Sequence, residues 1–198
     1  MKKLAIILFI EVQIVLGFLV YQNNQLQQLD QKVFNTNKML FQENRKKQIE
    51  ELSHSKVDDI KIGSDSAMNK VFLYTKMDCP YCEAFFTETY PAFKEEFIDT
   101  KKAQLVIRFM HSLQSEHQEK VKALYSASQK NQVLSVEQIT GKSGVTAVAT
   151  ENFDAFQKSI YTSALKAGIK SSPTFIIDGE IYKGSRKMTL FRSLLSDS

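Results

Sequence analysis

The sequence contains few cysteines and histidines, the usual ligands of a structural zinc site. Its 198 residues include only two cysteines, Cys79 and Cys82, and three histidines, His54, His111 and His117. A tetrahedral zinc site needs four ligands, and the spacing of the histidines does not complete one around the cysteines. A purely structural disulfide usually joins distant segments, because closing so short a loop removes little chain entropy. The Cys-Pro-Tyr-Cys stretch therefore indicates a redox-active dithiol, in preference to half of a metal site or a structural cross-link.

Glycine and proline are absent from residues 22–62, where glutamine, asparagine, lysine and glutamate dominate. This absence favours a long polar helix over a flexible linker. A helix of that length would extend about 60 Å at 1.5 Å per residue. Four apolar residues of this helix follow the three- and four-residue spacing of a coiled-coil seam. A stable coiled coil needs this spacing over three or four heptads, which is longer than the pattern here. We favour a solvated spacer, and a stalk that forms a homo-oligomer is the alternative. The seam residues are Leu26, Leu29, Val33 and Leu40.

The N-terminus carries the one long apolar run, from Leu4 to Tyr21, which only Glu11 and Gln13 interrupt. Its large apolar residues contribute about −6 kcal/mol to membrane insertion, against about +3 kcal/mol for an acid at mid-helix. No pair of small residues at Ala-x-Ala spacing follows the run, which disfavours a cleaved signal peptide. No cysteine follows it either, which excludes a lipoprotein anchor. We therefore expect residues 4–21 to form an uncleaved signal anchor with the rest of the chain outside the cytoplasm.

The remaining composition is that of an ordinary soluble domain, with 11% aromatic residues and no tryptophan. The formal net charge of +4 is too small to indicate a nucleic-acid partner. The length leaves room for one domain of about 130 residues with its own core. The turn at Gly63–Ser66 marks its start. We predict a transmembrane helix over residues 1–21, a polar helical stalk or linker over 22–66, and a globular domain over 67–198.

The cysteine pair lies between an expected strand and an expected helix. Val71–Thr75 is rich in β-branched and aromatic residues, as buried strands are, and a helix is expected to follow the cysteines. Pro80 suits a first helical position, because its missing N–H would have no partner there. Cys79 would then lie at the positive end of the helix, which lowers a thiol pKa from about 8.5 to roughly 3.5–7. We predict Cys79 as the exposed nucleophile and Cys82 as the more buried resolving thiol.

The rest of the domain predicts an α/β fold. A second strand over Ala103–Met110 would pair in parallel with the first through a right-handed crossover. Apolar residues at helical spacing then predict an insertion of three helices at about 111–167, with His111 and His117 on the surface at its start. Pro173–Ile177 and Glu180–Gly184 predict a hairpin around Asp178-Gly179. A helix over Arg186–Leu195 would close the domain.

The strand before Cys79-Pro80-Tyr81-Cys82, combined with the later Ser172-Pro173-Thr174-Phe175 strand and a terminal helix, resembles the DsbA-like thiol–disulfide oxidoreductases of the thioredoxin fold. The likeness covers roughly residues 71–195. A helical insertion between the second strand and the Ser-Pro strand is also what separates these proteins from plain thioredoxin. The resemblance implies a thioredoxin fold with a helical insertion, preceded here by the membrane anchor and the polar helix.

The resemblance also implies roles for further site residues. Pro173 would follow a cis peptide bond and face the dithiol, and Ser172 would offer its backbone N–H and C=O to an extended substrate segment. Pro80 and Tyr81 would tune the redox pair, and Tyr81 replaces the histidine that strongly oxidising relatives carry. Asp78 directly precedes Cys79 and should oppose thiolate formation. These two differences from strongly oxidising relatives, at Tyr81 and Asp78, argue against a strong oxidant. They leave the interpretation as a dithiol oxidoreductase intact.

The sequence thus predicts an enzyme that exchanges disulfides with exported, cysteine-containing proteins and needs no cofactor beyond the Cys79–Cys82 disulfide. The extracytoplasmic address favours an oxidase, because disulfides persist there. A membrane redox partner would recycle the dithiol. One alternative is an isomerase or reductase that the stalk assembles into an oligomer. An alternative of another class is a metal carrier or assembly factor that uses the same sulfurs.

Overall fold

The computed structural model describes residues 2–145 and 152–195, and the parts of the predicted insertion and C-terminus at 146–151 and 196–198 lie outside them. The chain divides into two units, Met1–Asn44 and Arg45–Ser198. The division into anchor, stalk and domain stays a prediction.

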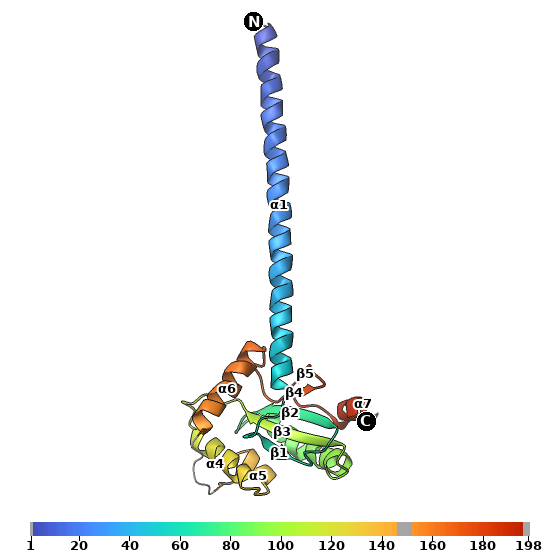
Figure 1. Ribbon diagram of the computed structural model, residues 1–198, viewed down its shortest axis with the longest axis vertical. Helices are drawn as coiled ribbons and strands as arrows, with labels where there is room; N and C mark the ends of the chain where they lie inside the picture. Colours follow the sequence, from blue (N-terminus) through green and yellow to red (C-terminus); the bar gives the residue numbers. More distant parts are fainter. Residues whose placement is uncertain (1, 146–151, 196–198) are drawn as a thin grey trace. The chain divides into compact units, whose positions relative to one another are not determined.

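The first unit consists of the greater part of helix α1, which spans Lys2–Leu52 (Figure 1). Every large apolar side chain described between Ile6 and Tyr21 is exposed. The four residues of the predicted seam are exposed as well, with values from 51% to 59%. Across the residues that the structure describes, no helix combines the length and the apolar character that a membrane crossing requires. The predicted anchor is therefore not confirmed and stays a prediction, as does the predicted oligomer.

The second unit is built on a five-stranded sheet in the order β1-β3-β2-β4-β5. The strands are β1 (Ile60–Ile62), β2 (Asn69–Thr75), β3 (Ala103–Phe109), β4 (Thr174–Ile177) and β5 (Glu180–Lys183). Strands β2 and β3 are parallel, and the other three pairs are antiparallel. The parallel pair and the β4–β5 hairpin confirm the predicted α/β arrangement.

Both faces of the sheet are covered, which explains why its central strands are continuous apolar runs. Because side chains alternate along a strand, Val71 and Leu73 of β2 enter one core cluster, and Phe72 and Tyr74 enter the other. The first cluster also takes side chains from the helix that follows the cysteines, from the insertion and from the C-terminal helix. The second is completed by the insertion and by the end of α1, where Leu52 is fully buried.

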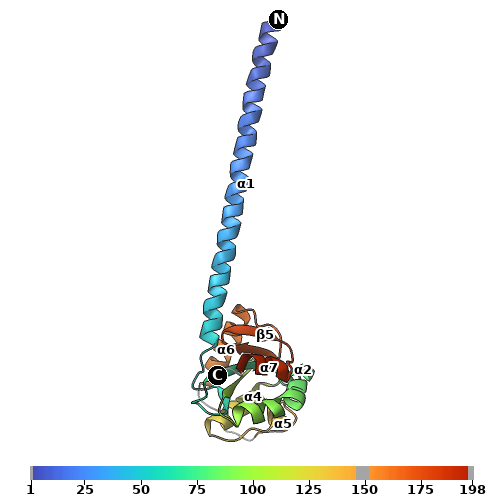
Figure 2. The same cartoon turned by 90° about the vertical axis from the view of Figure 1, so that its right-hand side faces the viewer.

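The helix after the cysteines runs through α2 (Pro80–Ala84), η1 (Phe85–Thr89), α3 (Tyr90–Phe93) and η2 (Lys94–Ile98). Its π-helical turn η1 ends directly before α3, which contains Pro91, a residue that has no N–H to donate. The C-terminal helix α7 (Met188–Leu195) lies beside this helix (Figure 2). The rings of Phe93 and Phe191 join the two helices, with centroids 5.0 Å apart.

The predicted helical insertion is confirmed as α4 (Gln118–Gln129), α5 (Val136–Ile139) and α6 (Phe153–Lys166). The three helices lie together on one side of the domain (Figure 1). Gln157 of α6 is buried, and its Nε2 donates to the carbonyl oxygens of Phe109 and His111 at 2.9 and 2.8 Å. These two hydrogen bonds fasten the insertion to the end of strand β3.

The polar helix was predicted to continue to Ile62, and this is wrong beyond Leu52. Helix α1 ends there, and Ile60–Ile62 forms the edge strand β1, which pairs with β3. The buried Arg108 of β3 explains the end of the helix. Its guanidinium donates to the carbonyl oxygens of Leu52 and His54 at 2.6 and 2.7 Å. The Leu52 carbonyl is one of those that a helix end leaves without an internal partner, and His54 lies in the turn that follows.

Candidate active site

The loop after β2 places Cys79 at the N-cap of helix α2. Its backbone is extended, with φ −106° and ψ 108°, and Pro80 follows in the first turn. The carbonyl oxygen of Cys79 accepts the N–H groups of Cys82 and Glu83 at 3.0 and 2.9 Å. The predicted position of the sulfur at the start of a helix is therefore present in the structure.

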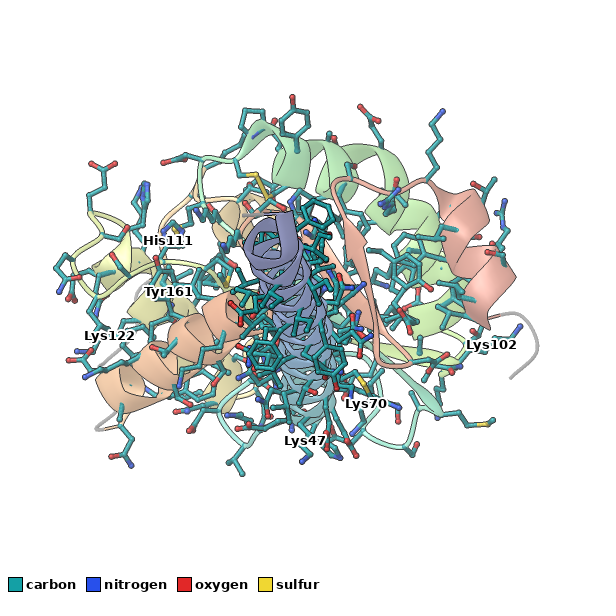
Figure 3. All side chains as sticks on the ribbon, turned by 90° about the horizontal axis from the view of Figure 1, so that it is seen from above. Lys47, Lys70, Lys102, His111, Lys122 and Tyr161 are labelled. Carbon is teal, nitrogen blue, oxygen red and sulfur yellow. A yellow bond between two sulfur atoms is a disulfide. The ribbon has the colours of Figure 1, made fainter. Side chains whose placement is uncertain are left out.

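Cys79 and Cys82 form a disulfide, with their Cα atoms 5.2 Å apart (yellow bond in Figure 3). Cys79 is partly exposed, whereas Cys82 is only 2% exposed. Tyr81, between them, is 71% exposed. The accessible sulfur is thus the one at the helix start, and its partner lies beneath the surface.

The Ser172–Pro173 loop faces the accessible sulfur. The peptide bond between these residues is cis. The Ser172 hydroxyl donates to Cys79 Sγ at 3.5 Å, and the Ser172 carbonyl oxygen lies 3.6 Å from the same sulfur. The backbone N–H of Cys82 also points at Cys79 Sγ, at 3.3 Å. Two donors therefore converge on Cys79 Sγ, and such donors favour a thiolate once the disulfide is reduced.

The insertion supports the loop that precedes Cys79. Asp78 has a positive φ of 52°, and its N–H lies 3.5 Å from the Thr140 carbonyl oxygen. Gly141 has φ +86° and packs so closely that a Cβ there would lie 3.3 Å from the Met77 Cβ. An ion pair between Lys142 and Glu83 continues this contact beyond the cysteines. The turn after α5 thus packs against the active-site loop, which sequence reasoning did not foresee.

The prediction that His111 lies on the surface is wrong, because its side chain is buried next to this loop. Its Nε2 accepts the N–H of Met77 at 2.9 Å. Burial lowers the pKa of His111 to about 4, and the nearby His117 and Lys76 act in the same direction. His111 is therefore neutral at pH 7. His117 is also largely buried, with 16% of its side chain exposed, and its Nε2 lies 3.3 Å from Asp78 Oδ2.

All seven residues predicted for the site lie on two segments, 78–82 and 172–173. Contacts to Cys79 Sγ bring Ser172 next to the disulfide, and Pro173 follows it as a buried residue. Asp78 contacts the insertion. Among the residues that the structure describes, no group of three or more histidine, cysteine, aspartate or glutamate side chains is placed to hold a metal ion.

A thioredoxin-like sheet with a Cys-x-x-Cys disulfide at a helix start and a cis-proline loop facing it defines a dithiol oxidoreductase of the thioredoxin fold. A family model described as "Thioredoxin" matches residues 55–113 and 106–197, which is well over half of the chain. The chain belongs to this family. The family and the dithiol together make it a thiol–disulfide oxidoreductase.

Solved structures show the same fold at low sequence identity. A linker-deletion mutant of Proteus mirabilis ScsC is 16% identical, with a TM-score of 0.61, 89% of this chain covered and 94% of that chain. Oxidised BdbD from Bacillus subtilis is 14% identical, with a TM-score of 0.54 and coverages of 72% and 94%. Wolbachia pipientis α-DsbA1 is 18% identical, with a TM-score of 0.51 and coverages of 74% and 94%. The search of curated proteins gives no match. The predicted DsbA-like fold is confirmed.

Proposed function

We propose that this chain is an oxidase that transfers its Cys79–Cys82 disulfide to exported proteins outside the cytoplasm. The observation that carries the proposal is the arrangement of donors around one accessible sulfur. The Cys82 N–H and the Ser172 hydroxyl both point at Cys79 Sγ, while the second sulfur is buried. A sulfur held in this way is a good leaving group, because a stabilised thiolate departs faster.

The exchange proceeds in two steps. A substrate thiolate attacks Cys79 Sγ, the Cys79–Cys82 bond breaks, and Cys82 leaves with the electron pair. A second substrate thiolate then attacks the substrate sulfur of the mixed disulfide, and Cys79 leaves as a thiolate. Two electrons pass from the substrate to this chain. The two protons that the substrate thiols lose end on the thiols of Cys79 and Cys82 or in the solvent. The substrate gains a disulfide.

Ser172 and Pro173 are proposed to position the substrate during the first step. The cis bond and the contact between the Ser172 carbonyl oxygen and Cys79 Sγ place this backbone at the reacting sulfur. An extended peptide that hydrogen-bonds to the backbone of Ser172 would bring its own sulfur to the same place. Main-chain pairing of this kind recognises a peptide without demanding a particular sequence. This suits an enzyme with many cysteine-containing substrates.

The oxidase direction rests on the balance of charges near Cys79. A lower thiol pKa stabilises the reduced enzyme and makes its disulfide a stronger oxidant. The two donors act in this direction, and the carboxylate of Asp78 acts against it. We propose that the donors prevail, and that a membrane redox partner reoxidises the dithiol after each cycle.

The proposed location depends on the first unit. The large apolar side chains described between Ile6 and Tyr21 are all exposed along one helix, and a bilayer would cover them. We propose that residues 4–21 anchor the chain with its dithiol outside. A membrane-impermeant thiol reagent, added to intact cells after mild reduction, should label Cys79. Labelling only after lysis would contradict this location.

Substitution of each cysteine in the full-length chain tests the exchange. Cys79→Ser should abolish disulfide formation in a reduced substrate protein, because the attacked sulfur is gone. Cys82→Ser should instead accumulate mixed disulfides when it is mixed with a substrate protein that already carries a disulfide, because its Cys79 thiolate can attack that disulfide while the chain has no second thiol to release the product. Non-reducing electrophoresis and a refolding assay measure both outcomes. Full activity of the Cys79→Ser variant would overturn the proposal.

A further inference from the structure

Two histidines of the insertion hold the dipeptide that precedes Cys79. His111 Nε2 accepts the N–H of Met77 at 2.9 Å, and His117 Nε2 lies 3.3 Å from the Asp78 carboxylate. The two imidazole rings are 5.1 Å apart. The active-site loop is therefore fixed from the insertion at two consecutive residues, by one backbone contact and one side-chain contact.

The two contacts are linked through Ser115. Because His111 Nε2 accepts a hydrogen bond and the ring is neutral, its Nδ1 carries the proton and donates to Ser115 Oγ at 3.2 Å. The same hydroxyl oxygen accepts the backbone N–H of His117 at 3.2 Å. This sequence of hydrogen bonds holds the backbone of His117 at the start of the insertion, next to the active-site loop.

The contact between His117 and Asp78 acts on a charge that matters for the chemistry. The Asp78 carboxylate directly precedes Cys79, and a nearby negative charge raises the pKa of a thiol. His117 Nε2 lies 3.3 Å from Asp78 Oδ2, which is close enough to offset part of this charge when the ring carries a proton on that nitrogen. Glu116 Oε1 lies 3.5 Å from the same nitrogen and competes for it. Further ionisable groups near the loop are Lys76, His111 and the ion pair between Lys142 and Glu83. Only 16% of the His117 side chain is exposed, against 61% for Asp78, so the imidazole is the fixed partner.

We propose that His117 is a positioning residue for the redox reaction. It binds the Asp78 carboxylate, reduces the repulsion between that carboxylate and the Cys79 thiolate, and thereby favours the reduced enzyme. His117 touches neither sulfur nor substrate, so it acts only through Asp78. The inference rests on the proposed function, because it concerns the reactivity of the same sulfur. It assigns to the insertion a part in setting the reduction potential.

A double-mutant cycle in the full-length chain tests this inference. His117→Phe keeps a ring of similar shape and removes the N–H donor, and Asp78→Asn removes the charge on which the donor acts. The reduced proteins are alkylated with iodoacetamide across a range of pH, and mass spectrometry follows the peptide that contains Cys79. Equilibration with glutathione buffers gives the reduction potential of each variant.

We expect His117→Phe to lower the acid dissociation constant of the Cys79 thiol on the order of threefold. The effect is this small because Asp78 is an exposed charge near the surface. The reduction potential should fall with it. In the Asp78→Asn background the same substitution should change neither quantity. An unchanged Cys79 titration in the single variant would overturn the inference. An equal shift in both backgrounds would overturn it as well, because the effect would then not pass through Asp78.

Two controls exclude causes other than the contact between His117 and Asp78 for a change in the Cys79 titration. His54→Leu removes a histidine whose Nδ1 lies 2.7 Å from the Glu50 carbonyl oxygen at the end of α1, and it should leave the Cys79 titration unchanged. His117→Leu replaces His117→Phe if thermal unfolding shows that the phenylalanine variant does not fold. The wild-type and Cys79→Ser chains are assayed for disulfide formation in parallel. If disulfide formation by the wild type requires Cys79 while Cys79 titrates in the His117 variants as it does in the wild type, the inference fails and the proposed function stands.

Discussion

Arg108 and Cys79 lie in two polar regions of the same domain that are built in opposite ways. Arg108 is fully buried, and all five of its N–H groups have acceptors: two on Asp59, and one each on Tyr74, Leu52 and His54. Cys79 is partly exposed, and the two donors that point at its sulfur leave room for a substrate. The first region has no group left for a ligand, whereas the second offers a reactive atom.

Stability and reactivity reside at different places in this domain. Burial alone would lower the pKa of Arg108, but the hydrogen bonds and charge of Asp59 and Tyr74 outweigh it and raise the pKa. The guanidinium therefore stays charged and acts as a fixed cross-link between β3, Asp59 and the end of α1. A buried pair of this kind is costly to break, although it adds little over a well-packed apolar replacement. The region around Arg108 thus holds the fold together, and the loop at Cys79 carries the thiol–disulfide exchange.

The largest effect should come from Arg108→Met. The substitution leaves the Asp59 carboxylate, the Tyr74 hydroxyl and the Leu52 carbonyl oxygen buried without their donor. We expect the free energy of unfolding to fall by about 3–5 kcal/mol. Urea unfolding of the full-length chain measures this loss.

The double variant Arg108→Met with Asp59→Leu should lose less, because no unpaired charge remains in the core. In both variants the Cys79 titration should match that of the wild type. A large change in Cys79 reactivity would show that the two regions are coupled, and the comparison would then fail.

A smaller effect should come from pH, through His111. Its pKa in the folded chain is about 4, below the ordinary value of 6.5, because burial disfavours the charged ring. The unfolded chain therefore binds a proton that the folded chain excludes, and stability should fall as the pH drops from about 6.5 to about 4. Since the ring is not wholly shielded from water, we expect His111 to contribute on the order of 2 kcal/mol to this loss.

His111→Gln isolates this contribution, since its amide oxygen can still accept the Met77 N–H and does not titrate. Urea unfolding at several pH values should show a shallower acid dependence for this variant than for the wild type. Equal slopes would mean that His111 titrates normally in the folded chain.

The central elements could be predicted because their signals are local. Strands β2 and β3 are apolar runs, and the N-cap position of Cys79 depends only on its neighbours in sequence. The cis bond before Pro173 came from the family resemblance, since only about 5% of such bonds are cis in general. Edge strand β1 was missed because three residues are too short for a periodic signal.

The contacts behind the site could not be predicted, because they join segments far apart in the chain. His111 lies in a polar stretch that resembles a surface loop, and only its contacts with Met77, Phe109 and the insertion show that it is buried. Arg108 did leave a signal. A charged residue within a buried apolar strand needs a partner, and Asp59 is that partner.

The rate at which iodoacetamide alkylates Cys79 shows whether the start of helix α2 holds this sulfur as a thiolate. The reduced, full-length chain is compared with the same chain unfolded in urea, across a range of pH. We predict that Cys79 in the folded chain titrates well below the ordinary cysteine value of about 8.5 and reacts faster at neutral pH. The same titration midpoint and rate in both states would contradict the account.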